Sequence, residues 1–598
     1  VAEDFSACQA ATIYILKGLK ELFRENEYRT QYCNAVTEND IGKKVRAAGW
    51  VENIRDHGGI MFVDLRDHYG VVQVVFHNEK LLEGIHKECA VSIAGTVLKR
   101  DESTYNDKIE TGTVEIEAEE VRILGKVTEQ LPFEVATSRE TREDVRLKYR
   151  YLDLRNKKMH DNIVLRSKII SFLRNKMSSM GFLELQTPIL STSSPEGARD
   201  YLIPSRKHHG KFYALPQAPQ QFKQLLMTSG FDRYFQIAPC FRDEDARADR
   251  SPGEFYQLDM EMAFATQEDV FAVLEDVLPP IFAQYGAYNR ASGAPFTRIP
   301  YNEAMENYGS DKPDLRIDLR VQDVTAVLGG CGFEPFAEGN LVKAVKVSDF
   351  HETRKFIDKT LADVETVSGG KAYWFRMDEN GELVGGISKF VSPIKDKVIE
   401  ALGLKANDFV ALSAGKREAA LKTAGVLIKT LGAAVPGHMD KEQYAFCWIV
   451  DFPMYEIGDE SGELEFCHNP FSMPSGGLDV LLKAEKGEID PLSITADQYD
   501  LVCNGVELSS GAVRNHDPEI MIKAFELVRL GEDDVKAKFP AMYNAFTYGA
   551  PPHAGIAPGV DRMVMLLAGE DSIREIIPFP MNKNAQDIMM GAPSEVTQ

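Results

Sequence analysis

The chain lacks several features that would each restrict its function. Its 598 residues include 8 scattered cysteines, and none of them form a CxxC pair. This spacing argues against a zinc site or a disulfide framework and favours reduced thiols, so we expect a cytoplasmic protein. No apolar run approaches the ~20 residues that cross a bilayer, so we expect no membrane partner. The first residues mix acids and lysines with apolar positions and do not resemble a secretory signal; they predict a short amphipathic helix.

A positive net charge is also missing. The formal net charge is −23, which taken alone argues against a nucleic-acid partner, because phosphate binding is mainly cationic. The distribution of charge matters more than the sum, and residues 139–168 are locally basic. A lone segment of this kind is usually a solvated helix with many ion pairs, and that is the simplest interpretation here.

Residues 45–125 read as a small β domain. Alternating apolar and polar runs are separated by Gly, Asp and Asn, which predicts five short strands and a small closed barrel. An oligonucleotide-binding (OB) barrel is the obvious candidate, because aromatic and polar side chains on one face can stack on unpaired bases and read them. The alternative is a structural or protein-binding module.

The rest of the chain predicts a mixed architecture. Residues 164–182 have helical apolar spacing, and 183–190 read as a strand that Pro188 stops. A self-contained stretch begins near 311, and apolar strands return after 441. We therefore predict an α+β multidomain protein with these parts: an N-terminal extension (1–28), the barrel (29–125), a polar hinge (126–160), a main domain (161–310 and 438–598) and an inserted α/β domain (311–437).

A highly charged turn lies at 240–250, between runs at 233–239 and 254–264 that both read as strands. Arg242 and Glu244 could face one cleft. An arginine fork suits a phosphate, and a carboxylate can accept from a base amino group or hold Mg²⁺. The alternative is a solvated hairpin tip, where exposed ion pairs are worth only ~0–1 kcal/mol.

A second candidate lies at 555–567, in the stretch GIAPGVDRMVMLL. Gly555 and Gly559 could let the backbone approach a ligand, and Arg562 falls in the first turn of a predicted helix, which favours an anion. The stretch is neither a Walker loop nor GxGxxG. The alternative is a tight packing turn whose arginine makes a surface ion pair.

A third candidate lies at 500–514. Asp500 and Glu507 are seven residues apart, which on one straight strand would place them on opposite faces. A bulge at Gly505 would restore a common face, where two carboxylates could share Mg²⁺ and nucleotide oxygens. Small residues at 509–511 leave room for a ligand, and Arg514 follows. The alternative is a strand with ordinary polar outward residues.

Taken together, these stretches resemble the class II aminoacyl-tRNA synthetases, and among them the bacterial type of aspartyl-tRNA synthetase. The resemblance covers roughly residues 29 to the end. Many separate motifs agree in order, which makes a chance likeness very improbable. They are GFLELQTPIL (181–190), FRDEDARADRSPGEFYQLDME (241–261) and GVDRMVMLL (559–567) for the class, and 194–206, 215–227, 468–472 and 505–514 for the aspartate enzymes. The resemblance implies a GAD-type inserted domain.

The resemblance implies a role for each matching residue at an ATP site. Arg242 would bind the α-phosphate and the substrate carboxyl, and Arg562 the γ-phosphate side of a bent ATP. Glu244 would hold the adenine amino group. Asp500 and Glu507 would carry Mg²⁺, so ATP and Mg²⁺ are the expected cofactors. The remaining residues expected to contact ATP are Asp243, Gly559, Val560 and Asp561.

The resemblance also implies a pocket for L-aspartate. Arg514, Lys223 and His468 would supply cations for the side-chain carboxylate, and an uncharged amide would leave the arginine unpaired. Without the motif context, the alternative for Lys223 is a solvated lysine on a helix. The alternative for His468 is a core histidine whose ring nitrogens are hydrogen-bonded. The α-ammonium would contact Glu196, Gln220 and Asp259.

In this family the barrel reads the anticodon. Phe62 would stack on a base, which is worth ~1–3 kcal/mol, although the barrel core is the alternative place for this ring. The residues expected to read base edges are Arg55, Gln73 and Glu115. His57 and Ser103 stand where strictly tRNA(Asp)-specific relatives tend to carry leucine and lysine, and relatives with a histidine and a small residue there tend to charge tRNA(Asn) as well.

The implied function is a homodimeric aspartate–tRNA ligase that charges tRNA(Asp) and, by hypothesis, tRNA(Asn); the alternative is a strictly tRNA(Asp)-specific enzyme. One rival is a paralogue that makes asparagine or modifies another acceptor through the same adenylate. Another is a non-catalytic protein that binds tRNA or single strands. The sequence departs from the family at Ala218, often serine, and at Asn469, often a second histidine, and Gly253 lengthens a motif loop.

Overall fold

The computed structural model describes residues 25–193, 198–458 and 461–595. The chain divides into two compact units between Pro132 and Phe133. The helix expected over the first residues lies outside the described ranges. Within those ranges, no helix is both long and apolar enough to cross a bilayer.

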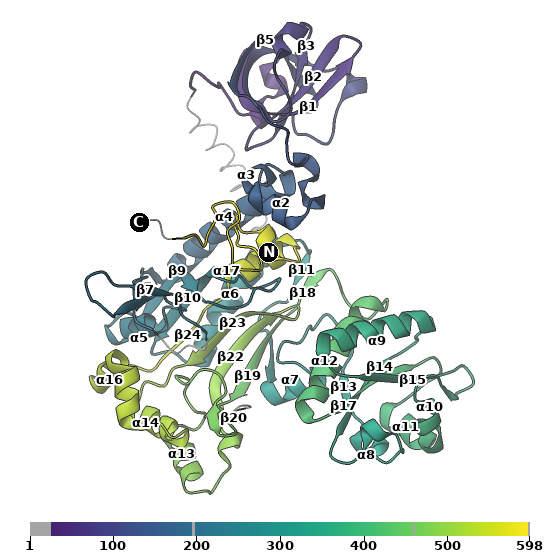
Figure 1. The fold of residues 1–598 in the computed structure, drawn as a ribbon, viewed down its shortest axis with the longest axis vertical. Helices are drawn as coiled ribbons and strands as arrows, with labels where there is room; N and C mark the ends of the chain where they lie inside the picture. The colour runs from purple at the N-terminus through teal and green to yellow at the C-terminus, as the bar shows by residue number, and fades with distance from the viewer. Residues whose placement is uncertain (1–24, 194–197, 459–460, 596–598) are drawn as a thin grey trace. The chain divides into compact units, whose positions relative to one another are not determined.

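The first unit contains the predicted barrel, a sheet that closes on itself in the order β1-β2-β3-β5-β4 (Figure 1). Side chains alternate along β2: Val63 and Leu65 are buried in the barrel core, while Phe62 and Asp64 point to the other face. Closing the sheet into a barrel buries the apolar face. The strands are β1 (Lys44–His57), β2 (Ile60–Arg66), β3 (Val71–Phe76), β4 (Ala90–Lys99) and β5 (Val114–Gly125), with 3₁₀ turns at Cys33–Ala35, Glu38–Asp40, Glu79–Leu82 and Glu102–Thr104.

The second unit is built on a mainly antiparallel sheet in the order β12-β19-β22-β23-β24-β10-β9-β6, with parallel pairing at both edges. The strand predicted over 183–190 is much shorter than expected. It pairs only at Leu183–Glu184 before the chain reaches Pro188, which has no N–H to donate. The strands are β6 (Leu183–Glu184), β9 (Arg233–Phe241), β10 (Glu254–Ala263), β12 (Thr297–Pro300), β19 (Phe446–Pro453), β22 (Thr495–Cys503), β23 (Val506–Val513) and β24 (His553–Ile556).

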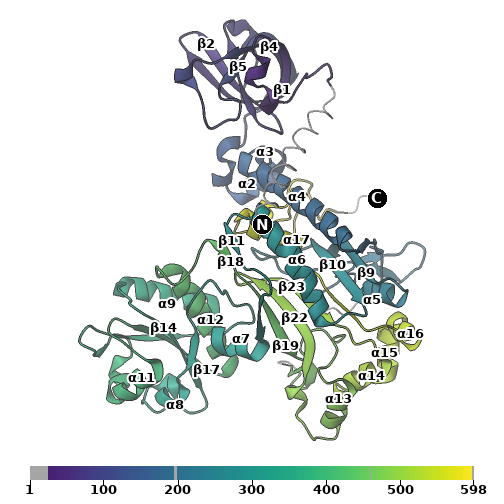
Figure 2. The same cartoon turned by 180° about the vertical axis from the view of Figure 1, so that it is seen from behind.

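Three helices cover one face of this sheet: α4 (Lys157–Ser179), α6 (Gln267–Tyr285) and α17 (Val560–Ala568). Figure 2 shows α6 lying across the strands. In β10, Leu258 and Met260 belong to the core beneath the helices, so by alternation Asp259 and Glu261 point to the opposite face. That second face therefore carries charged side chains, and it is where the predicted site residues gather.

The locally basic segment is not a solvated helix. Its arginines Arg146 and Arg150 are buried and both bind Asp153, at 3.1 and 2.6 Å, and Arg146 also lies 2.8 Å from Glu575. These cations therefore hold the start of the second unit to its C-terminal part. The predicted hinge over 126–160 contains a 3₁₀ turn (Val135–Glu140), α2 (Glu143–Lys148), α3 (Arg150–Asp153) and the first residues of α4.

The predicted insertion forms a second antiparallel sheet in the order β13-β14-β17-β15-β16. Helices α9 and α12 pack on one face and α8, α10 and α11 on the other, each with its own apolar core (Figure 1). The bounds are β13 (Val321–Asp323), β14 (Leu341–Val347), β15 (Ala372–Met377), β16 (Leu383–Val384), β17 (Phe409–Gly415), α8 (Thr325–Leu328), α9 (Arg354–Ser368), α10 (Ser388–Val391), α11 (Lys395–Leu402) and α12 (Arg417–Ala434).

Shorter elements surround the main sheet. Helix α7 leads from β12 toward the insertion, and α5 lies against β10. Their bounds and those of the others are α5 (Gln220–Thr228), α7 (Tyr301–Tyr308), α13 (Gly477–Glu485), α14 (Pro518–Leu527), α15 (Glu532–Lys538), α16 (Pro540–Thr547), β7 (Leu202–Pro204), β8 (Phe212–Ala214), β11 (Arg290–Ala291), β18 (Gln443–Tyr444), β20 (Tyr455–Ile457) and β21 (Leu464–Phe466).

Candidate active site

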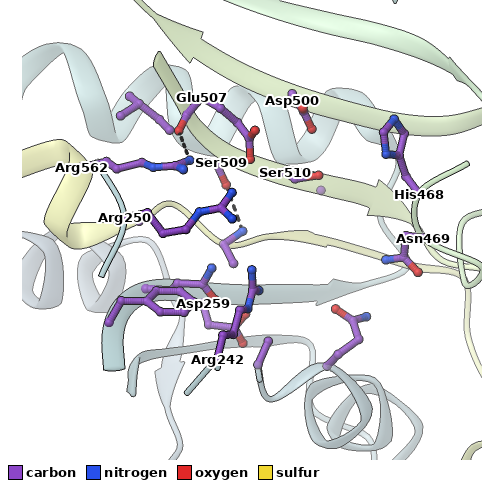
Figure 3. A pocket seen from close by; sticks show the side chains of 18 of the residues that line it. Arg242, Arg250, Asp259, His468, Asn469, Asp500, Glu507, Ser509, Ser510 and Arg562 are labelled. Carbon is purple, nitrogen blue, oxygen red and sulfur yellow. Dashed lines mark hydrogen bonds and ion pairs between the residues drawn. The ribbon is translucent and has the colours of Figure 1, made fainter. Parts of the chain in front are cut away.

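A cleft of about 780 Å³ opens on the polar face of the main sheet (Figure 3). Its size is that of a pocket for a nucleotide-sized ligand. Segments far apart in the sequence meet here, because β10, β22 and β23 are brought together in one sheet. The predicted residues that line the cleft are Gln220, Lys223, Arg242, Glu244, Asp259, His468, Asp500, Glu507, Arg514, Gly559, Asp561 and Arg562.

Asp500 and Glu507 lie on two strands of a hairpin rather than on one bulged strand. The turn is Asn504-Gly505, and both residues have positive φ values, 52° and 76°. A two-residue Asn-Gly loop is typical of a tight β-hairpin. The prediction of a bulge at Gly505 is therefore wrong; the irregular pairing falls one step further in, beside Leu501. The hairpin itself brings both carboxylates to the cleft.

The carboxylate pair is electrostatically strained. Asp500 is buried, and its Oδ1 has no hydrogen-bond partner within the described residues. Burial raises the pKa of Asp500 well above its ordinary value, and the nearby negative charge of Glu507 raises that pKa further. Lys312, from the first residues of the insertion, lies 3.3 Å from Glu507. The sequence analysis missed Lys312, since nothing in its spacing links it to the hairpin.

Arginines line the other side of the cleft. Arg562 follows Gly559 in the first turn of α17; it donates to the Glu507 backbone oxygen at 2.7 Å and lies 3.3 Å from Asp249 (Figure 3). Arg242 donates to a backbone oxygen at 3.4 Å and lies 5.0 Å over the ring of Phe255. Both side chains are half-buried, so their remaining donors can serve a ligand.

Glu244 is engaged by a cation that the sequence analysis missed. Its Oε2 lies 2.8 Å from Arg250 Nη1, and both side chains line the cleft. The signal for Arg250 was present, because it lies in the same charged turn. The pairing leaves Glu244 with acceptor capacity, since a carboxylate has two oxygens.

A buried charge group forms the floor of the cleft. Lys223 lies 2.8 Å from Asp259 and 3.4 Å from Glu261, and Glu261 binds Arg514 at 2.8 and 3.2 Å. All four side chains are buried. The two cations lower the pKa of Glu261, although burial opposes them, whereas burial raises the pKa of Asp259. The sequence analysis missed Glu261, although a period of two places it on the same face as Asp259.

His468 and Gln220 also border the cleft. Burial lowers the pKa of the His468 imidazole below its ordinary value. The predicted role of His468 as a cation stays a prediction. Gln220 donates to Gln224 at 2.9 Å, and Gln224 lies 3.1 Å from His553.

Some predicted residues do not reach the cleft. Val560 packs in the hydrophobic core. Asp561 does line the cleft, but both of its oxygens are engaged, one by Arg166 and the other by the Tyr256 N–H. Asp243 is not among the residues that line the cleft. Glu196 lies outside the described residues.

Gly555 serves packing rather than ligand approach. A Cβ placed on it would lie 2.0 Å from Glu261 Oε2 and 2.3 Å from a backbone oxygen of β10. The expectation that Gly555 lets the backbone reach a ligand is therefore wrong. A Cβ placed on Gly559 would make only ordinary van der Waals contacts, the nearest at 3.7 Å, and this glycine lines the cleft.

The barrel carries a separate polar network. Arg55 binds Asp64 at 2.7 Å and Gln73 at 3.3 Å, and Gln73 donates to Glu115 at 2.7 Å. Phe62 is half-buried and lies outside the barrel core cluster, which removes the alternative that its ring is core.

The two residues expected to set tRNA choice lie at exposed positions of the barrel. His57 ends β1, with its ring 5.6 Å from that of Phe62. Ser103 is held by Asp101, which accepts from its hydroxyl at 2.7 Å.

Comparison with known proteins agrees with this arrangement. Residues 142–583 match the family model described as tRNA synthetases class II (D, K and N), and residues 45–124 match an OB-fold nucleic acid binding domain. A protein of Rickettsia felis named Aspartate–tRNA(Asp/Asn) ligase is 50% identical over 582 residues, 96% of each chain. A Streptomyces coelicolor protein named Aspartate–tRNA ligase is 51% identical over 582 residues, 96% of this chain and 97% of its own.

Solved structures share the fold at low sequence identity. Asparaginyl-tRNA synthetase from Pyrococcus horikoshii, complexed with asparaginyl-adenylate, has a TM-score of 0.56 at 18% identity and covers 92% of this chain and 97% of its own. Aspartyl tRNA synthetase from Entamoeba histolytica has a TM-score of 0.53 at 19% identity, covering 91% and 89%.

Proposed function

The chain belongs to the family of class II tRNA synthetases (D, K and N), and from this premise we propose that it is an aspartate–tRNA ligase. One observation carries the proposal: Arg242, Arg562, Glu507 and Arg514 converge on one cleft from distant parts of the chain. A binding protein without catalysis would have no use for this set of charges around a nucleotide-sized space.

The reaction has two steps. The α-carboxylate of L-aspartate attacks the α-phosphorus of ATP, and pyrophosphate leaves. The 3′-hydroxyl of the tRNA terminal ribose then attacks the carbonyl of the aspartyl-adenylate, and AMP leaves. Arg242 neutralises the α-phosphate, Arg562 binds the γ-phosphate side, and Glu244 accepts from the adenine amino group. Positioning and charge neutralisation supply most of the catalysis, because the attacking carboxylate needs no base.

Mg²⁺ fits the carboxylate pair. The unpartnered Oδ1 of Asp500 beside Glu507 is an oxygen site that a hard cation would satisfy. The described residues contain no group of three metal-ligating side chains. Mg²⁺ usually takes one or two carboxylates and completes its shell with phosphate oxygens and water. Bound there, the ion would neutralise phosphate charge.

The charge group on the cleft floor suits L-aspartate. Asp259 and Glu261 already balance Lys223 and Arg514, so the cations can remain buried before the substrate arrives. The guanidinium has five N–H donors, and Glu261 uses only part of them. The side-chain carboxylate of the substrate would share the Arg514 guanidinium with Glu261. The side-chain amide of asparagine would instead point its own N–H donors at the N–H donors of the guanidinium.

The barrel recognises tRNA through its outer polar face. Phe62 stacks on an anticodon base, and Arg55, Gln73 and Glu115 read base edges. His57 and Ser103 favour charging of both tRNA(Asp) and tRNA(Asn), and a relative at 50% identity carries the name Aspartate–tRNA(Asp/Asn) ligase. A relative at 51% is named Aspartate–tRNA ligase, so overall identity does not decide this point.

The enzyme acts as a homodimer in the cytoplasm. The stretch 181–190 is the expected dimer contact, and it exposes Leu183, Ile189 and Leu190, at 50%, 41% and 55% of their surface. An apolar cluster of this kind is typical of a protein–protein contact.

The test is aspartate-dependent ATP–pyrophosphate exchange, followed by charging of tRNA(Asp) and tRNA(Asn) transcripts side by side. We expect exchange without tRNA and aspartate incorporation on both transcripts. Absence of exchange would refute the ligase proposal. Full charging of tRNA(Asp) with none of tRNA(Asn) would refute the relaxed choice alone. The double variant His57→Leu with Ser103→Lys should lose tRNA(Asn) charging and keep exchange.

A further inference from the structure

The inserted part of the chain reaches into the candidate ATP site. Lys312 lines the cleft, and its Nζ lies 2.6 Å from Asp311 and 3.3 Å from Glu507. The hairpin turn that carries the two metal-binding carboxylates packs on the same segment. A Cβ placed on Gly505 would lie 3.3 Å from the Cβ of Asp314.

The insertion is firmly docked at this point, so the position of Lys312 is fixed by the fold. Glu306 of α7 binds Lys343 at 2.6 Å and Arg417 at 2.7 Å, and both partners belong to the inserted sheet and its helix α12. Close packing follows at Gly309, where a Cβ would lie 2.5 Å from the Gly425 nitrogen. Lys312 comes three residues later.

A cation at this place has a clear physical effect. Asp500 is buried with an unpartnered Oδ1, and Glu507 adds a second negative charge beside it. Two adjacent carboxylates without a counter-ion repel each other and lose solvation. Lys312 supplies the nearest positive charge, 3.3 Å from Glu507, and Arg562 lies 3.8 Å from the same carboxylate. The side chain of Lys312 is 33% exposed, so it can leave Glu507 without losing contact with water.

We propose that Lys312 is a resident counter-cation of the metal-binding carboxylates, which a divalent cation must displace. Before nucleotide binds, Lys312 holds Glu507 and screens Asp500. When the metal arrives with ATP, the ammonium turns to the phosphate oxygens that enter the same cleft. The insertion therefore has a role in the nucleotide site as a positioning element. This inference rests on the proposed ATP-dependent function.

The experiment measures Mn²⁺ binding to the full-length, nucleotide-free enzyme by electron paramagnetic resonance of free Mn²⁺. Lys312→Met should bind Mn²⁺ about tenfold more tightly than the wild type, because one competing charge is gone. Lys312→Gln is a second neutral variant with the same expectation, in case one of them folds poorly. Lys312→Arg should stay near the wild type. Lys429→Met, from the same neighbourhood but outside the cleft lining, is the matched control and should change nothing.

Other outcomes would overturn the inference. If Lys312→Met binds Mn²⁺ no more tightly than the wild type does, the lysine does not compete with the metal. Mn²⁺ binding too weak to detect in every variant would show that the carboxylates are no cation site. Wild-type ATP–pyrophosphate exchange separates the two proposals: if exchange occurs and Mn²⁺ affinity does not rise, only the role of Lys312 fails.

Discussion

The substitution Glu261→Gln tests the buried charge group most directly. Glu261 is fully buried and faces two cations, Arg514 at 2.8 Å and Lys223 at 3.4 Å. The substitution keeps the shape of the side chain and removes the charge, so two buried cations would share the single carboxylate of Asp259. Breaking a buried ion pair from one side costs about 3–5 kcal/mol, because a charge is left unpaired in the interior. We expect a loss of that size in unfolding free energy.

Tryptophan fluorescence can follow this loss in the right part of the molecule. The chain has 3 tryptophans, one in the barrel, one in the inserted sheet and Trp448 in the main sheet. Trp448 is buried and stacks on Phe271 at 3.9 Å, so it reports the packing of the catalytic sheet. Urea unfolding in a Trp50→Phe, Trp374→Phe background would therefore monitor that sheet alone.

The control is Glu254→Gln, the same substitution at the exposed start of the same strand. It should change the unfolding free energy by less than about 0.5 kcal/mol, as is usual for surface positions. A loss below about 1 kcal/mol for Glu261→Gln, or an equal loss for both variants, would refute the reasoning.

Three further predictions follow from the structure. Gly555→Ala should lower the unfolding free energy by at least about 1–3 kcal/mol, because its Cβ would clash with Glu261. Gly559→Ala is the control and should unfold like the wild type. Equal urea midpoints for the two variants would contradict this prediction. Phe62→Ala should raise the KM for tRNA about 5- to 150-fold and leave tRNA-independent pyrophosphate exchange unchanged; an unaltered KM would exclude stacking. Burial lowers the pKa of His553, so the folded protein binds this proton more weakly than the unfolded chain, and stability falls as the pH drops below about 6.5. The Tm of His553→Gln should therefore fall less between pH 7.5 and 5.5 than that of the wild type, and equal losses would be the contrary result.

The barrel and the main strands could be predicted because alternation is a local signal. Residues two apart in β2 and β10 separate into a core face and a polar face, and the sequence displays that period directly. Motif resemblance then located Arg242, Arg514 and Arg562, and the sheet brings all three to one cleft.

Contacts between distant segments could not be predicted in the same way. Arg146 looked like part of a solvated basic helix, but its partner Glu575 lies 429 residues away, and no local pattern reveals that pair. The hairpin at Asn504-Gly505 is different, because its dipeptide is a strong local turn signal. The error there came from treating Asp500 and Glu507 as members of one strand, where their odd spacing demanded a bulge.

The two sides of the cleft differ in how exposed the cations beside their buried carboxylates are. On the side proposed to bind the amino acid, Lys223 and Arg514 are only 2% exposed, and their carboxylate partners are buried with them, so neither cation can leave without a large desolvation cost. On the side proposed to bind a metal, the nearest counter-ion of Glu507 is Lys312, which is 33% exposed and can move into water, and Arg562 lies further off at 3.8 Å. A buried charge group of this kind holds its geometry, which suits the proposed selection of one amino acid. In the proposed reaction an exchangeable ion suits this side, because the carboxylates would keep a positive partner both before the metal binds and after it leaves.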